Sequence, residues 1–369
     1  MGDSMEKVKK PSKDLRSQEK SELCQPLTMP DDIKEGSRSP DPSTLKLDGS
    51  GLPLIPQPTT LPTDPLNYPD WLKYLILVQV SFLAALSILG VGILNPVVVP
   101  LAKEFNITPV LATYTTTVAL GTGSLGPLIF TPIANVYGRR PAYLISVLIG
   151  LGSAVGAATA TSFSKLMVAR AFTGLGPSAA MGIGAGTVVD LFYGHQRGRA
   201  MGIFILLSTN GSHLAPIIGG YIARDRSWRW CLWASAMING ATFFIILFFM
   251  PETLFDRPDE STKEIFADDK EKIDEIEDVS SPREAYRSPP MEFRTYIRRL
   301  WFWDLDRPAS RQIKAKDFVV RPLSLLKYPS VVFPALYFSV TYGLASIEPA
   351  LTLATLFTKI YKFDTAQNG

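Results

Sequence analysis

The stretch 202–220, GIFILLSTNGSHLAPIIGG, decides the fold class, because it is apolar, long enough to cross a bilayer and rich in glycine. Glycine is roughly 1 kcal/mol less favourable than alanine inside a helix, so several glycines and a proline in one helix require a reason. Small residues allow two membrane helices to approach closely, and proline with glycine bends a helix. The residues that form this pattern are Gly202, Gly211, Ala215, Pro216, Gly219 and Gly220. A bent, closely packed membrane helix beside a central cavity is typical of a protein that moves a solute.

The composition divides the chain into a polar tail and a membrane region. Residues 1–70 are rich in Pro, Ser, Lys and acidic residues and contain no long apolar run, which predicts a disordered tail. Residues 71–250 are mostly aliphatic, with short polar turns. A membrane span needs about twenty apolar residues, and the segments that fit are 74–100, 109–133, 141–162, 164–190, 199–222 and 228–250. The net charge of only +3 gives no reason to expect nucleic acid as a partner.

The rest of the chain is interpreted as a central loop and one further span. Residues 251–327 are charged, and a seventh apolar segment follows near 330–357. Within the loop, residues 291–303 mix aromatics with arginines, which is typical of an interfacial helix on an anionic leaflet, although a plain linker would also fit. The final residues form a polar run, so we interpret 328–369 as a seventh span with a truncated C-terminus.

The six spans of residues 71–250 form two related groups of three. The tripeptide LGP at 125–127 matches LAP at 214–216 at an offset of 89 residues, and the same offset carries Arg140 onto Arg229. It also places spans one and three on spans four and six. Since three is an odd number of spans, the second group must be inverted relative to the first, as in many secondary transporters. The predicted fold is therefore an all-α membrane protein with a six-helix bundle of two inverted repeats and one helix of a second bundle.

Basic residues near the ends of spans predict the orientation in the membrane. Those on the side of the tail and central loop are Lys73, Arg311, Lys314, Lys316, Arg321 and Lys327. The positive-inside rule places this side, and with it the N-terminus, in the cytoplasm. Asn106 begins the sequon Asn-Ile-Thr and would lie outside, where it is a candidate glycosylation site.

The turn between spans two and three carries a basic motif. Gly138 permits a tight turn, and Arg139 and Arg140 can bridge helix ends and carboxylates. The turn resembles the loop signature of the major facilitator superfamily, with Asn135 at the position that is acidic in the family. The stretch 202–220 resembles the superfamily's span-five antiporter signature, with Ala215 where the family usually has glycine. The alternative for the turn at 138–140 is that its basic residues only fix the topology of the chain in the membrane.

Two charged residues in span four are candidates for proton coupling. A charge inside a span is costly and marks a functional site by default. Arg170 resembles the arginine of the superfamily's span-four motif, with glycine four residues later at Gly174. The alternative is that Arg170 extends to the membrane surface. Asp190, at the other end of the span, either pairs with Arg139 or is a solvated carboxylate.

Candidate residues for a substrate cavity are less specific. They are Asn95, His213, Tyr337, Tyr342 and Glu348. Glu348 is a carboxylate in an apolar stretch and could bind a proton or a cation, or could contact water at the outer helix end. His213 is included because histidine titrates near neutral pH.

The resemblance implies a multi-pass transporter of the twelve-span, fungal drug:proton antiporter type, truncated after span seven. Such proteins export small hydrophobic or cationic compounds by alternating access, most simply across the plasma membrane. The chain has no P-loop, metal-ligand cluster or nucleophile–base arrangement, so we expect no enzyme activity, no cofactor and no metal. The proton gradient would supply the energy. The alternatives are an inactive half-transporter that serves as a scaffold or regulator, an uptake symporter, and a seven-span receptor. The sequence leaves the oligomeric state open.

Overall fold

The computed structural model describes Lys46, residues 54–59, Leu61, residues 64–255, Tyr296 and residues 324–344, the last without the side chains of Phe338 and Tyr342. Most of the predicted central loop lies outside the described residues, as does the interfacial segment 291–303 except for Tyr296. Residues 345–369 also lie outside them. Every regular element in the described ranges is a helix, so this part of the chain is all-α.

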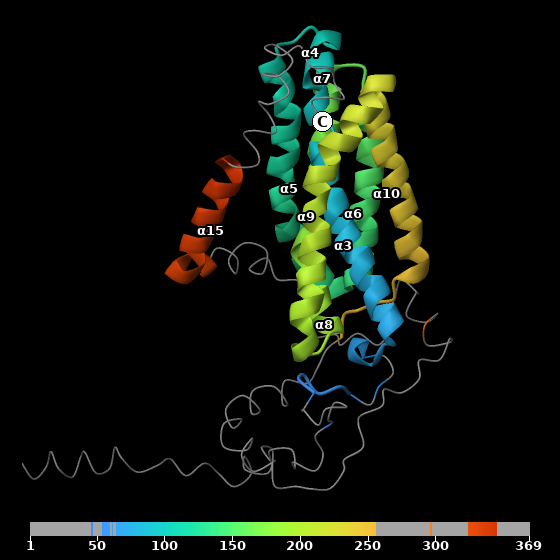
Figure 1. Cartoon of the computed structure of the whole chain (residues 1–369), viewed down its shortest axis with the longest axis vertical. Helices are drawn as coiled ribbons and strands as arrows, with labels where there is room; N and C mark the ends of the chain where they lie inside the picture. The colour runs from blue at the N-terminus through green and yellow to red at the C-terminus, as the bar shows by residue number, and fades with distance from the viewer. Residues whose placement is uncertain are drawn as a thin grey trace, which may run out of the picture. The chain divides into compact units, whose positions relative to one another are not determined.

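Five helices are long and apolar enough to cross a membrane (Figure 1). The first runs over Asp70–Glu104 and is built from three pieces. These pieces are α3 (Asp70–Gly92), the short helix η3 (Asn95–Val97) and α4 (Val98–Glu104). The others are α5 (Pro109–Tyr137), α6 (Arg139–Ala158), α9 (Gly194–Asp225) and α10 (Arg229–Phe249). Their bounds lie within a few residues of the predicted spans, except that α9 begins five residues earlier than 199.

The fourth span is not the single helix predicted over 164–190. It consists of α7 (Phe163–Leu175) and α8 (Ala179–Leu191), with a break at Gly176 and Pro177. Proline has no N–H to continue the helical ladder. The hydroxyl of Ser146 on α6 donates to the carbonyl of Gly176 at 2.6 Å, so a carbonyl at the break is satisfied by a neighbouring helix. A Cβ at Gly176 would lie 2.6 Å from the backbone nitrogen of Gly150, so the break also requires glycine.

The bundle has two ends, which we name after residues found there. At the Arg139 end, α3, α6 and α9 begin and α5, α8 and α10 finish, whereas the turn after α4 lies at the Glu104 end (Figure 1). The first helix is the central one: 67% of its apolar window is buried, against 22% for α5 and α9. It packs most extensively against α9, while α6 packs against α10 and α5 against α7.

Part of the tail predicted to be disordered through residue 70 is folded. Residues 65–67 form the short helix η2 (Pro65–Asn67), with Asp64 as its N-cap. Tyr68 is 1% exposed and belongs to the core of the bundle. The polar composition alone could not predict this folded segment. Its order comes from contacts with residues far along the chain rather than from an apolar run.

The described part of the seventh predicted span is helical. It contains the short helix η4 (Leu325–Lys327) and α15 (Pro329–Tyr342). The remainder of the segment 330–357 lies outside the described residues.

Candidate functional site

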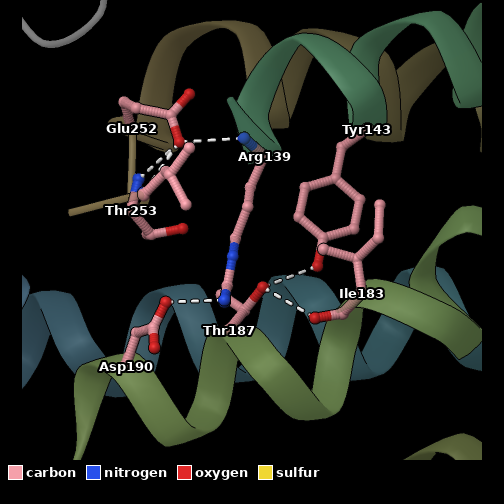
Figure 2. Close-up of polar contacts among 8 residues, drawn as sticks. Arg139, Tyr143, Ile183, Thr187, Asp190, Glu252 and Thr253 are labelled. Carbon is pink, nitrogen blue, oxygen red and sulfur yellow. Dashed lines mark hydrogen bonds and ion pairs between the residues drawn. The ribbon is translucent and has the colours of Figure 1, made fainter. Parts of the chain in front are cut away.

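A cluster of charged residues occupies the Arg139 end of the bundle. Gly138 separates α5 from α6 and has φ 105°, a conformation that side-chain-bearing residues rarely adopt. Because of this turn, α6 starts at Arg139, whose guanidinium extends across to α8 (Figure 2). There its Nη2 lies 2.6 Å from a carboxylate oxygen of Asp190. Gly186 leaves room for this crossing, since a Cβ there would lie 3.2 Å from the same nitrogen.

The second carboxylate of the cluster is Glu252, which follows α10. Its side chain accepts a hydrogen bond from the backbone N–H of Arg139 at 2.9 Å (Figure 2). It accepts another from the backbone N–H of Arg140 at 3.2 Å. It also accepts from the N–H groups of Thr253 and Leu254. A carboxylate at a helix N-terminus satisfies free N–H groups and interacts favourably with the helix dipole. Glu252 therefore joins the end of the sixth span to the start of the third.

Sequence reasoning did not place Glu252 in the site. Asn135, at the position that is acidic in the family, is exposed in the last turn of α5, and the carboxylates at Arg139 come from α8 and from the segment after α10. The available signal was the string Pro-Glu-Thr directly after an apolar span. The hydroxyl groups of Tyr143 and Thr187 are 2.8 Å apart, next to the ion pair (Figure 2). No pattern in the sequence pointed to these two residues.

Arg170 lies inside the bundle rather than at the membrane surface. It is 0% exposed, which contradicts the alternative that it extends out of the membrane. Its guanidinium donates to the carbonyls of Gly90 at 2.7 Å and Val91 at 2.6 Å. These carbonyls belong to the last turn of α3, next to the break in the first span. The partial negative charge of a helix C-terminus stabilises a cation there. Among the described residues no carboxylate pairs with Arg170.

Asn95 lies in the same break. Its side-chain oxygen accepts from the hydroxyl of Thr116 on α5 at 3.1 Å. The break itself follows from Pro96, which has no N–H to donate. Arg170 on α7 and Thr116 on α5 thus stabilise the interrupted helix from two neighbouring helices. Interrupted helices with exposed backbone groups form the binding sites of many secondary transporters.

The glycines of the span-five pattern do not all have the same environment. A Cβ at Gly211 would lie 2.2 Å from the carbonyl oxygen of Ala85, and one at Gly219 would lie 2.2 Å from that of Ile93. Both carbonyls belong to the first span. Gly202 is exposed, with nothing within 4 Å of its Cβ position.

The middle of the pattern also contacts the first span. Ala215 is 0% exposed, and a Cβ at Gly92 would lie 3.1 Å from its side chain. Glycine on the first span therefore leaves room for alanine at 215. Pro216 lies inside α9, and Gly220 is buried near its C-terminal end.

The remaining predicted cavity residues are not gathered with these groups. His213 is exposed on α9, and Tyr337 is exposed on α15. The side chain of Tyr342 and all of Glu348 lie outside the described residues. A groove of about 580 Å³ runs between α6 and α7, and Asn95 and His213 do not line it. Asn106 is exposed in the turn after α4, with φ 53°.

At the Glu104 end, Arg229 makes the counterpart of the contacts of Arg140. Its Nη1 donates to the carbonyl of Ala158 at 3.1 Å, whereas Nη2 of Arg140 donates to that of Leu247 at 2.6 Å. The offset of 89 residues relates both the two arginines and the two carbonyls, which is the relation that the predicted inverted repeats would give. Arg229 also forms an ion pair with Glu104 at 2.8 Å, and the indole N–H of Trp228 donates to the same carboxylate.

No group of three or more His, Cys, Asp or Glu residues that could hold a metal ion occurs within the residues that the structure describes. The arrangement instead offers ion pairs at both ends of a helical bundle and a buried cation beside an interrupted helix. These features define an all-α, multi-pass membrane protein.

The sequence model of the Major Facilitator Superfamily matches residues 80–369, so the chain belongs to this superfamily of membrane transporters, which are not enzymes. The MFS antiporter QDR3 of Candida albicans is 30% identical over 63% of this chain and 35% of its own length. Fluconazole resistance protein 1 of Saccharomyces cerevisiae is 26% identical over 84% of this chain and 52% of its own length. The chain thus spans between about a third and a half of the length of these curated relatives.

Solved structures include similar chains. The human organic anion transporter MFSD10 matches with a TM-score of 0.47 and 16% sequence identity, covering 81% of this chain and 68% of its own.

Proposed function

We propose that this protein exports small hydrophobic or cationic compounds by proton-coupled alternating access. Two relatives support this class of activity by their names, one an MFS antiporter and the other a fluconazole resistance protein. In this proposal the bundle rocks as a unit against a second bundle, and the substrate binds beside the interrupted first span. The span-five pattern supports efflux rather than uptake, because of its resemblance to the antiporter signature.

The observation that carries the proposal is the fully buried Arg170 at the break in the first span. Arginine stays protonated in proteins, so Arg170 does not itself carry the coupled proton. Its fixed charge creates a positive potential beside Asn95 and holds the carbonyls of Gly90 and Val91 in place. Loss of this guanidinium would free the broken helix and remove the potential together.

Asp190 is the proposed proton-carrying group. Its side chain is 24% exposed, so a proton from water can reach it, and its partner Arg139 is 9% exposed. Protonation removes the charge that holds Arg139. Breaking a largely buried ion pair costs about 3 kcal/mol, which is enough to bias two conformations by roughly a hundredfold. Protonation of Asp190 would therefore release the Arg139 end of the bundle.

The proposed orientation places the Arg139 end and the N-terminus in the cytoplasm, in the plasma membrane. The basic residues that flank the first and seventh spans support this orientation. Asn106, at the Glu104 end, would then face outward and be open to glycosylation.

The test is efflux of a cationic dye from host cells that lack their own exporters and express this chain. We expect Arg170→Ala to lower the efflux rate at least tenfold at equal surface expression, and Arg170→Lys to restore part of it. Lys165→Ala is the matched control, because Lys165 is an exposed cation on the same helix. Efflux by Arg170→Ala at the control rate would contradict the proposal. If the unaltered chain moves no dye, the alternative of an inactive scaffold replaces the proposed export function.

A further inference from the structure

The described residues that precede the first span, 54–59, 61 and 64–69, make a set of defined contacts, and we call them the strap. Asp64 is 0% exposed and organises it, accepting from the N–H of Thr59 at 2.9 Å and of Leu66 at 3.0 Å. The side-chain amide of Asn67 donates to the carbonyls of Thr59 and Leu61. These bonds join Thr59 and Leu61 to the residues around η2.

The strap is attached to the bundle at two places. The first is the turn between α8 and α9, where the hydroxyl of Tyr193 donates to the carbonyl of Leu66 at 3.2 Å. At the same turn, the N–H of Gly194 donates to the carbonyl of Ile55 at 2.7 Å. The side chains of Leu54, Leu66 and Tyr193 form a small apolar cluster under these bonds.

The second attachment is at the segment after α10. The hydroxyl of Tyr68 donates to the backbone carbonyl of Glu252 at 2.9 Å, and both residues are buried. These two partners are 184 residues apart in the sequence.

Both attachments adjoin the acidic partners of Arg139. Tyr193 follows Asp190 by three residues, and Asp190 pairs with the Arg139 guanidinium. Tyr68 holds the main chain of Glu252, whose carboxylate accepts from the Arg139 backbone N–H. The strap therefore contacts each of the two segments that supply a carboxylate to Arg139.

We infer that Tyr68 and Tyr193 are positioning residues, through which the strap sets the geometry of the Arg139, Asp190 and Glu252 cluster. The consequence for transport rests on the proposed function, whereas the positioning itself does not. Tyr68 holds the Glu252 carboxylate over the first turn of α6, and Tyr193 holds the end of α8 that carries Asp190.

The test is amide hydrogen exchange of the full chain in detergent micelles or nanodiscs, comparing Tyr68→Phe with the unaltered protein. The substitution removes only the hydroxyl and keeps the buried ring. A lost hydrogen bond of ordinary strength should speed exchange about fivefold at the Arg139 and Arg140 amides. Tyr114→Phe, in an exposed position on α5, is the matched control and should leave these amides unchanged.

A double-variant cycle separates positioning from general stability. Glu252→Ala removes the acceptor of the Arg139 and Arg140 amides, so adding Tyr68→Phe should speed their exchange no further. Tyr193→Phe should instead increase exchange at the end of α8. An equal effect of Tyr68→Phe with and without the Glu252 carboxylate, or exchange rates equal to those of the control, would overturn the inference. Because exchange does not depend on transport, a chain that moves no dye would still give this result.

Discussion

Replacing Gly211 by alanine tests the contact between the first and fifth spans. The new Cβ would lie 2.2 Å from the carbonyl oxygen of Ala85 and 2.8 Å from its carbon. Since real Cβ atoms essentially never approach closer than 3.0 Å, α3 and α9 must separate by close to an ångström. Overpacking costs about 1–3 kcal/mol, and the upper part of this range, about 2–3 kcal/mol, applies because the contact is with backbone atoms. The gain in helix propensity is about 1 kcal/mol. The net effect should be a destabilisation of about 1–2 kcal/mol.

The matched control is Gly202→Ala in the same helix, where nothing lies within 4 Å of the Cβ position. There only the propensity gain remains, so stability should stay equal or rise. The assay is the apparent melting temperature of the detergent-solubilised protein, followed by size-exclusion chromatography after heating. We expect Gly211→Ala to melt about 2–6 °C lower than the unaltered protein. Equal melting temperatures for the two variants would refute the close packing of these helices.

Three further changes test other parts of the bundle. Gly138→Ala places a side chain at φ 105° and should destabilise the protein by about 1–2 kcal/mol, measured by thermal unfolding. Arg229→Gln removes the ion pair to Glu104 and the hydrogen bonds to the carbonyls of Ala158 and Ala160, and should lower stability by about 1–2 kcal/mol in the same assay. The loss should exceed that of Arg226→Gln, in which the guanidinium lies over the ring of Trp230. Asp190→Asn imitates the protonated carboxylate, so dye efflux should lose most of its dependence on cytoplasmic pH while the protein remains folded.

The apolar runs were sufficient to predict the spans, because bilayer thickness sets their length and backbone hydrogen bonding makes them helical. The break at Gly176 and Pro177 was missed because the residues around it are apolar and the fourth span reads as continuous. What decides the break is the pairing with Ser146 and Gly150 on another helix, which no local pattern shows.

The candidate site was predictable only where charge stood out against an apolar background. Arg170 and Asp190 were found in this way. Their partners were not, since Arg170 is satisfied by main-chain carbonyls of the first span, which carry no signal in the sequence. Glu252 and the strap were hidden for a related reason. They lie in polar segments, and their roles depend on contacts between residues more than a hundred positions apart.

The most direct test of proton-coupled export is transport into inside-out vesicles that contain this protein, with a proton gradient imposed across the membrane. We expect a cationic dye to accumulate when the lumen is acidic, a protonophore to abolish the accumulation, and Asp190→Asn to uncouple it from the gradient. Accumulation that is independent of the gradient, or equally coupled in Asp190→Asn, would contradict the account.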